Sequence, residues 1–242
     1  MIKAILIDFG HTLVKQRTDE ELLLKRGIRR LTNYLKMKGY PLPVDQFERV
    51  EKASRNEADR FREKTLIEVK ALNRMTVLLN RFGVPVSPDD ELAQKALLLF
   101  YEPIVKDMRL YPDSIRFLRA LKKEGYKLAL VSNAANDIAV KEAAKRLGVA
   151  KFFDTLVISS QVEIRKPGLA IFMRALKDLK VKPSEAVFIG DSMSKDVIGA
   201  KKVPMKTILI IRQFKKIKQS ISDANVKTLT EAAEVLAAWK KA

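Results

Sequence analysis

Four short apolar segments of this chain each run directly into polar residues, and this arrangement constrains the fold more than any other feature. Each segment is too short for a helix and has the character of a strand buried on both faces of a parallel sheet. The carboxyl ends of such strands form the edge where open α/β sheets bind their ligands. The segments and the residues after them are Ile2–Ile7 with Asp8, Leu128–Val131 with Ser132 and Asn133, Leu156–Ile158 with Ser159 and Ser160, and Ala186–Ile189 with Gly190 and Asp191.

After Pro112, helix and strand patterns alternate to the end of the chain. Alternation of this kind indicates an α/β fold with a doubly wound parallel sheet. Thr207–Ile210 is predicted to be the last strand of the series. Helices are predicted near residues 113–124, 137–146, 168–179, 195–202 and 229–241.

Residues 16–107 differ in character, because helical patterns replace the strand patterns there. Local start and stop signals predict four helices in this stretch. The signals are a capping box at Thr18–Glu21, an apolar pattern from Val44 to Phe61, a second capping box at Thr65–Glu68 with Gly83 as the stop, and Ser87 followed by Pro88. We therefore predict a core domain of residues 1–15 and 108–242 and an inserted four-helix bundle of residues 16–107.

Composition narrows the cellular setting. The 242 residues include no cysteine, and 47% are hydrophobic. No apolar stretch approaches the roughly 18 residues of a membrane-spanning helix, and no signal peptide is recognised. We expect a cytoplasmic protein, and the 31% of charged residues are typical of a thermophile.

The formal net charge of +18 raises the question of an anionic partner. The densest basic cluster surrounds Phe214 and consists of Arg212, Lys215, Lys216 and Lys218. Basic residues are otherwise spread along the chain, and no nucleic-acid-binding motif is recognised. We interpret the charge as a solvated basic surface.

The order and spacing of the polar motifs resemble those of the haloacid dehalogenase (HAD) superfamily, most of whose members are magnesium-dependent phosphohydrolases. The motifs are Asp8–Thr12, Ser132–Asn133, Lys166 before Pro167, and Gly190–Asp191 with Asp196. The resemblance covers nearly the whole chain outside the insert. It implies a Rossmann-like HAD core, with the insert as the helical cap domain that many members carry after the first motif.

The resemblance implies a role for each matching residue. Asp8 would be the nucleophile, since carboxylates form aspartyl-phosphate intermediates. Lys166 would offset the charge of Asp8 and of the phosphate. Ser132 would donate a hydrogen bond to the phosphate, with Asn133 beside it as a substrate-binding residue.

The same resemblance implies a Mg²⁺ site, which suits carboxylate ligands. Asp8 and Asp191 would bind the ion directly, and Asp196 would act through water or pair with the lysine. The family also uses the backbone carbonyl of residue 10, which a glycine retains. Gly10 is nevertheless a departure, because the family usually has a second aspartate at this position, where it serves as acid and base.

His11 and Thr12 complete the predicted site as substrate-binding residues. His11 is the only histidine of the chain and lies next to the position that lacks the aspartate. A histidine exchanges protons near neutral pH, so His11 is one candidate for the missing acid–base role. Thr12 is expected to hold the loop.

These observations favour a magnesium-dependent phosphatase that acts on a small phosphorylated metabolite and is slowed by Gly10. Two alternatives stay open. A regulatory or phosphate-binding protein with weak catalysis would explain Gly10. A haloacid dehalogenase is the less favoured alternative, because dehalogenases also lack the second aspartate but need no metal.

Overall fold

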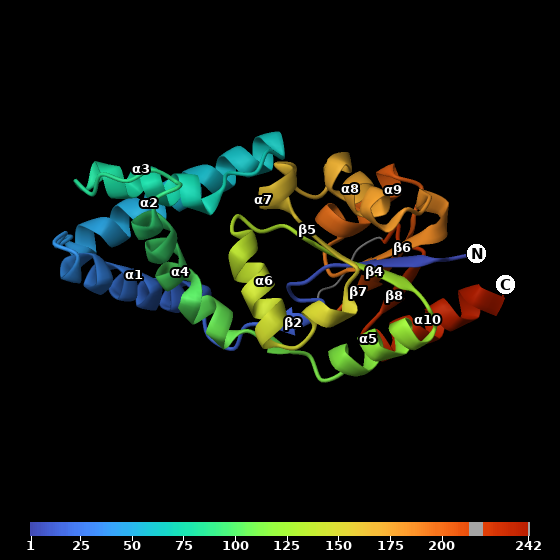
Figure 1. Ribbon diagram of the computed structural model, residues 1–242. Coiled ribbons are helices and arrows are strands. Elements are labelled where there is room, and N and C mark those ends of the chain that lie inside the picture. Colours follow the sequence, from blue (N-terminus) through green and yellow to red (C-terminus); the bar gives the residue numbers. More distant parts are fainter. Residues whose placement is uncertain (213–219, 242) are drawn as a thin grey trace. The chain divides into compact units, whose positions relative to one another are not determined.

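The computed structural model describes residues 1–212 and 220–241 (Figure 1). Most of the basic cluster lies outside the described residues, namely Phe214, Lys215, Lys216 and Lys218. The chain forms two compact units. The first unit contains Met1–Lys15, Arg109–Ala134 and Ala144–Ala242, and the second contains Gln16–Met108 and Ala135–Ala143. The domain limits expected from the sequence remain a prediction.

The first unit is built on a sheet of six parallel strands in the order β5-β4-β1-β6-β7-β8. The predicted α/β fold with a parallel sheet is therefore confirmed. The strands are β1 (Ala4–Ile7), β4 (Lys127–Ser132), β5 (Thr155–Ile158), β6 (Ala186–Gly190), β7 (Lys206–Ile210) and β8 (Ala224–Val226). The last of these was not expected, because three residues carry too little pattern to indicate a strand.

The connections of β1 and β6 bring the site residues together. These two strands are neighbours, with Ile7 opposite Ile189. After β1 the chain continues in the sheet with β4, which lies on the other side of β1 from β6. After β6 it continues with β7, which lies on the other side of β6 from β1. The strand order therefore reverses between β1 and β6, which is the position where open α/β sheets form a ligand crevice.

Helices pack on both faces of this sheet (Figure 1). On one face, Phe172 of α8 meets Phe188 of β6 edge-on, with the ring centroids 5.2 Å apart. Leu6 and Val131 belong to the same buried core. Successive strand residues point to opposite faces, so Ile5 and Ile7 of β1 face the other helical layer. The helices of this unit, including the end of α6, are α5 (Ser114–Lys123), α6 (Asp137–Arg146), α7 (Ser159–Val162), α8 (Leu169–Leu179), α9 (Ile198–Lys202) and α10 (Leu229–Lys241).

The second unit contains the four predicted helices. They are α1 (Glu20–Met37), α2 (Val44–Thr65), α3 (Ala71–Arg81) and α4 (Glu91–Asp107). The first and last of them approach most closely at Gly27, where a Cβ atom would lie 2.0 Å from the carbonyl oxygen of Phe100. A glycine is therefore required for this packing. The first unit also contains two short antiparallel strands, β2 (Val14–Lys15) and β3 (Arg109–Leu110). They lie at the two points where the chain passes between the units.

The predicted helix starts in this unit were wrong in detail. Asp19, not Thr18, caps α1 and accepts a hydrogen bond from the backbone N–H of Leu22 at 3.2 Å. The Thr18 hydroxyl instead donates to Asp107 at 2.8 Å. This contact joins residues far apart in the sequence and is therefore invisible to a local pattern.

The other two start signals failed for similar reasons. Thr65 is the last residue of α2, and its hydroxyl donates to the carbonyl of Phe61 at 2.8 Å. The helix ends there because Leu66 adopts a positive φ of 60°. Asp90, not Ser87, precedes α4. In the described part of the chain, no helix is long and apolar enough to cross a membrane.

Candidate active site

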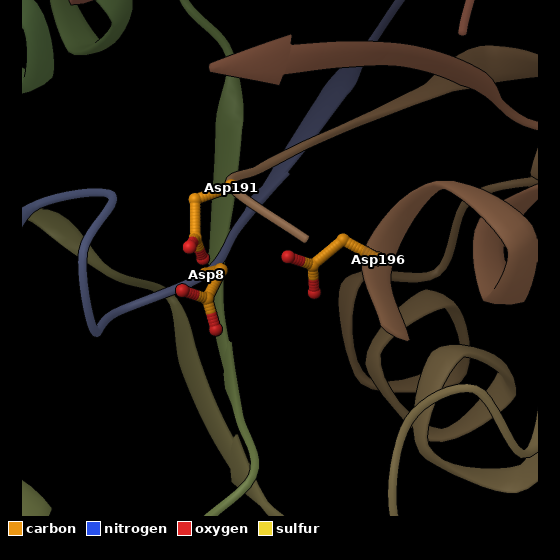
Figure 2. Close-up of side chains that lie close together, drawn as sticks. All are labelled: Asp8, Asp191 and Asp196. Carbon is orange, nitrogen blue, oxygen red and sulfur yellow. The ribbon is translucent and has the colours of Figure 1, made fainter. Parts of the chain in front are cut away.

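Three carboxylates converge at the carboxyl ends of β1 and β6 (Figure 2). Asp8 follows β1, Asp191 follows β6, and Asp196 lies in a turn of π-helix at Met193–Val197. Each offers an oxygen, and these oxygens all lie within 4.8 Å of one another. The backbone N–H of Asp8 donates to the carbonyl of Ile189 at 2.9 Å, so strand pairing holds the first carboxylate beside the second.

Lys166 is buried against two of these carboxylates. Its Nζ lies 2.5 Å from Asp8 Oδ1 and 2.8 Å from Asp196 Oδ1. The Nζ also donates a hydrogen bond to the carbonyl of Val131 at 2.9 Å. Burial alone would lower the pKa of Lys166, but Asp196 and Asp8 outweigh it and raise the pKa.

Asn133 holds the backbone of Lys166 in place. Its Oδ1 accepts from the Lys166 backbone N–H at 2.8 Å, and its Nδ2 donates to the Lys166 carbonyl at 2.9 Å. The sequence placed Asn133 among the substrate-binding residues. The structure shows its amide engaged with the lysine segment, while Ser132, which ends β4, is buried beside it.

Gly190 makes room for Asp196. A Cβ atom at residue 190 would lie 2.4 Å from Asp196 Oδ2. That oxygen accepts the backbone N–H of Ser192 at 2.9 Å. The helix predicted at 195–202 begins as this π-helical turn and continues as α9, and the turn carries the third carboxylate into the cluster.

The cluster carries excess negative charge. Three carboxylates and one ammonium leave a formal charge of −2. Burial, together with Asp196 and Asp191, raises the pKa of Asp8 from 3.8 to about 7, although Lys166 opposes the shift. Divalent cations with a preference for oxygen ligands suit this donor set, and Mg²⁺ is bound in proteins through one or two carboxylates plus water and phosphate. The residues therefore fit the expected metal.

The raised pKa of Asp8 predicts a pH-dependent stability of the metal-free protein. Below pH 4 the carboxyl group is protonated in both states, and between about 4 and 7 only the unfolded chain releases the proton. The melting temperature of the wild type, measured with a chelator, should therefore decline relative to that of Asp8→Asn as the pH rises across this window. Mg²⁺ should restore it at pH 8. A difference between the two proteins that stays constant with pH would contradict the assignment.

The loop after Asp8 contains the remaining predicted residues. The Thr12 hydroxyl donates to Asp8 Oδ2 at 3.1 Å, and Thr12 is fully buried. His11 is exposed, has a φ of 56°, and donates its backbone N–H to Val14 at 2.7 Å. A Cβ atom at Gly10 would meet no described atom within 4 Å. Space is therefore not the reason that residue 10 lacks a side chain.

Sequence reasoning did not find a group of residues behind this loop. Arg212, which the sequence showed only as part of a basic cluster, bonds to the carbonyl of Thr12 and to Asp113. The guanidinium carbon lies 3.7 Å from the ring centroid of Tyr111. No local pattern could have linked them, since Thr12 and Arg212 are 200 positions apart.

Comparison with known proteins agrees with this geometry. The model of the haloacid dehalogenase-like hydrolases matches residues 2–203, and the chain belongs to this hydrolase family. A glyceraldehyde 3-phosphate phosphatase of Methanopyrus kandleri is 37% identical over 138 residues, which cover 56% of this chain and 57% of that protein. Another, from Pyrococcus abyssi, is 28% identical over 208 residues, which cover 86% of this chain and 81% of that one.

A solved structure with the same fold is a 2-haloacid dehalogenase from Pseudomonas syringae. It is 25% identical, has a TM-score of 0.74, and the match covers 99% of this chain and 100% of the other. The chain thus spans less than two thirds of the first of these relatives and nearly all of this structure. The fold and family follow from the comparisons, whereas the reaction depends on the site.

Proposed function

We propose that the protein is a magnesium-dependent phosphatase that acts on a small phosphorylated metabolite through an aspartyl-phosphate intermediate. The observation that carries the proposal is the buried cluster in which Lys166 bridges Asp8 and Asp196 while Asp191 lies within reach of both carboxylates. Because a dehalogenase needs no metal, a cluster of three carboxylates that could hold a metal ion favours the phosphatase over the dehalogenase.

Asp8 would act as the nucleophile. Its carboxylate oxygen forms a bond to phosphorus, the bond from phosphorus to the leaving oxygen breaks, and water later attacks the phosphorus to release phosphate. Lys166 offsets the charge that gathers on Asp8 and the phosphoryl oxygens. Ser132 would donate a hydrogen bond to the phosphate. Asn133 would support the site by holding the backbone of Lys166.

Asp8 and Asp191, with the carbonyl of Gly10, would bind Mg²⁺ directly, and Asp196 would act through water or as the partner of Lys166. When bound, the ion neutralises phosphoryl oxygens and orients the substrate. The contact between Lys166 and Asp196 supports the interpretation of Asp196 as a lysine partner, with Asp191 as the direct ligand. Thr12 orients Asp8, and His11 is proposed to contact the substrate.

The two curated relatives suggest the substrate class. Both are named as phosphatases of glyceraldehyde 3-phosphate, and we propose a small sugar phosphate for this chain as well. A panel of phosphorylated metabolites that includes triose phosphates, assayed with and without Mg²⁺, tests this choice. Turnover of sugar phosphates no faster than that of unrelated esters would contradict it.

Gly10 favours one second candidate, a phosphate-binding protein with weak catalysis. An aspartate at residue 10 would protonate the leaving group, a contribution worth roughly 10²–10⁴-fold in rate. An aryl leaving group needs little protonation. We therefore expect slow turnover in the wild type, with a strong preference for aryl over alkyl phosphates.

Restoring the carboxylate should remove that preference. Gly10→Asp is expected to raise turnover of alkyl phosphates by roughly 10²-fold or more, and that of aryl phosphates much less. The absence of described atoms around a Cβ at residue 10 makes the substitution sterically acceptable. The measurement is kcat/KM for an alkyl and an aryl ester in parallel.

His11→Ala is the companion variant. If Gly10→Asp changes neither rate and His11→Ala silences the wild type, the histidine performs the proton transfer. If wild type and both variants are inert while phosphate and Mg²⁺ still bind, the binding function replaces the enzymatic one.

A further inference from the structure

Arg212 makes an unusually complete set of contacts for a residue outside the recognised motifs. It follows β7, and its side chain is only 10% exposed. Nε and Nη2 donate to the carbonyl oxygen of Thr12 at 3.1 and 2.9 Å. Nη1 and Nη2 donate to the two carboxylate oxygens of Asp113 at 3.3 and 3.0 Å. Only a planar guanidinium can make these two forked contacts at once, and a lysine cannot.

The far side of this arrangement is anchored to helices. Asp113 lies directly before α5, and its Oδ2 also accepts the backbone N–H of Leu229, the first residue of α10, at 2.8 Å. The ring of Tyr111 covers one face of the guanidinium, with 3.7 Å from the guanidinium carbon to the ring centroid. Asp113 and Tyr111 therefore fix the orientation in which Arg212 contacts the Asp8 loop.

The near side of the arrangement is the loop of the nucleophile. The Thr12 carbonyl receives two hydrogen bonds from Arg212, and the Thr12 hydroxyl donates to Asp8 Oδ2 at 3.1 Å. Lys166 holds the other oxygen, Oδ1. The orientation of the Asp8 carboxylate thus depends on Thr12, whose peptide is held by a residue 200 positions away.

The ion pair of Arg212 indicates that this residue supports the Asp8 loop and does not bind the substrate. The positive charge of Arg212 is paired with Asp113, at 3.0 Å, in a site with little exposure. A guanidinium that already uses its donors on Thr12 and Asp113 has little to offer a phosphate group. Its removal should change the geometry of the nucleophile more than the electrostatic attraction of the substrate.

We propose that Arg212 is a positioning residue that holds Thr12, and through it the Asp8 carboxylate, in the orientation required for attack on phosphorus. The inference rests on the proposed phosphatase function. Misplacement of a reacting group by about 1 Å costs up to roughly 10²-fold in rate. The loss should appear in kcat more than in KM, because Arg212 uses its donors on Thr12 and Asp113 and not on the substrate.

The test compares Arg212→Lys and Arg212→Gln with the control Arg174→Gln. Arg174 also pairs with an aspartate, Asp178, at 2.9 Å. Unlike Arg212, it is exposed, and its partner lies one turn away on the same helix. With an aryl phosphate and Mg²⁺, we expect kcat to fall roughly 10- to 100-fold in both Arg212 variants. At saturating Mg²⁺, KM should change by less than about twofold, and the control should match the wild type.

Chemical rescue and circular dichroism separate positioning from a loss of folding. Added guanidinium ion should restore part of the kcat of Arg212→Gln and none in the control. Unchanged kcat in both Arg212 variants overturns the proposal. So does a loss of activity that follows the loss of folded protein and does not respond to guanidinium.

Beryllofluoride, which mimics a phosphoryl group on aspartate, gives a readout without turnover. If the wild type hydrolyses no ester but binds beryllofluoride in the presence of Mg²⁺, the proposed function fails. The positioning role is then supported by weaker beryllofluoride binding in Arg212→Gln and overturned by equal binding. A wild type that shows neither turnover nor binding overturns both proposals.

Discussion

Turnover of an aryl phosphate is expected to fall by roughly 10⁴-fold or more when Asp8 is replaced by asparagine, because the amide cannot form the covalent intermediate. The shape of the site should survive the change. An asparagine retains one oxygen that can accept from Lys166 or from Thr12, which contact the two carboxylate oxygens at 2.5 and 3.1 Å. The measurement is the initial rate at saturating substrate and Mg²⁺.

Asp178→Asn is the matched control. Asp178 also pairs with a basic residue, Arg174, but on the exposed face of α8. Its substitution should leave the rate unchanged. An Asp8→Asn protein that is folded and keeps more than about a tenth of the wild-type rate would show that another group attacks the phosphate, since loss of a nucleophile is normally far larger.

Removal of the metal is expected to have the second largest effect. Charge neutralisation by a bound cation contributes several kcal/mol, which corresponds to roughly 10³-fold in rate. Both a chelator and the variant Asp191→Ala should therefore abolish metal-stimulated turnover. The −2 charge of the cluster, with the three carboxylate oxygens within 4.8 Å of one another, is the physical reason.

A thermal shift assay checks that the effect comes from this site. Mg²⁺ should raise the melting temperature of the wild type, and it should do so much less for Asp191→Ala. Asp191→Asn, which keeps one oxygen ligand, should fall between the two. Full activity in the presence of a chelator would instead favour the dehalogenase alternative, which the sequence left open.

The sheet was predictable because its strands are continuous apolar runs. Ala186–Gly190 and Ala4–Ile7 are buried on both faces, and such segments carry a strong signal. The meeting of Asp8 with Asp191 followed from the same principle, since parallel strands bring their carboxyl ends to one edge. Their chemical roles were inferred from a resemblance, and the variants above test them.

The helix starts and the contacts of Arg212 were not predictable, for a different reason. Thr18 and Asp19 are both good capping residues, and the choice between them is set by Asp107, which binds the Thr18 hydroxyl. Arg212 likewise finds Thr12 and Asp113 only after the chain has folded. Local patterns carry no information about such long-range partners.

The covalent step is the centre of the proposed mechanism and can be observed directly. Borohydride reduces an acyl phosphate on aspartate to homoserine, and mass spectrometry of the peptide that contains Asp8 detects the product. Quenching the wild type with borohydride during turnover of an aryl phosphate with Mg²⁺ should convert Asp8, and omission of Mg²⁺ should prevent the conversion. Continued turnover with Asp8 unmodified, or with homoserine at another aspartate, would contradict the assignment of Asp8 as the nucleophile.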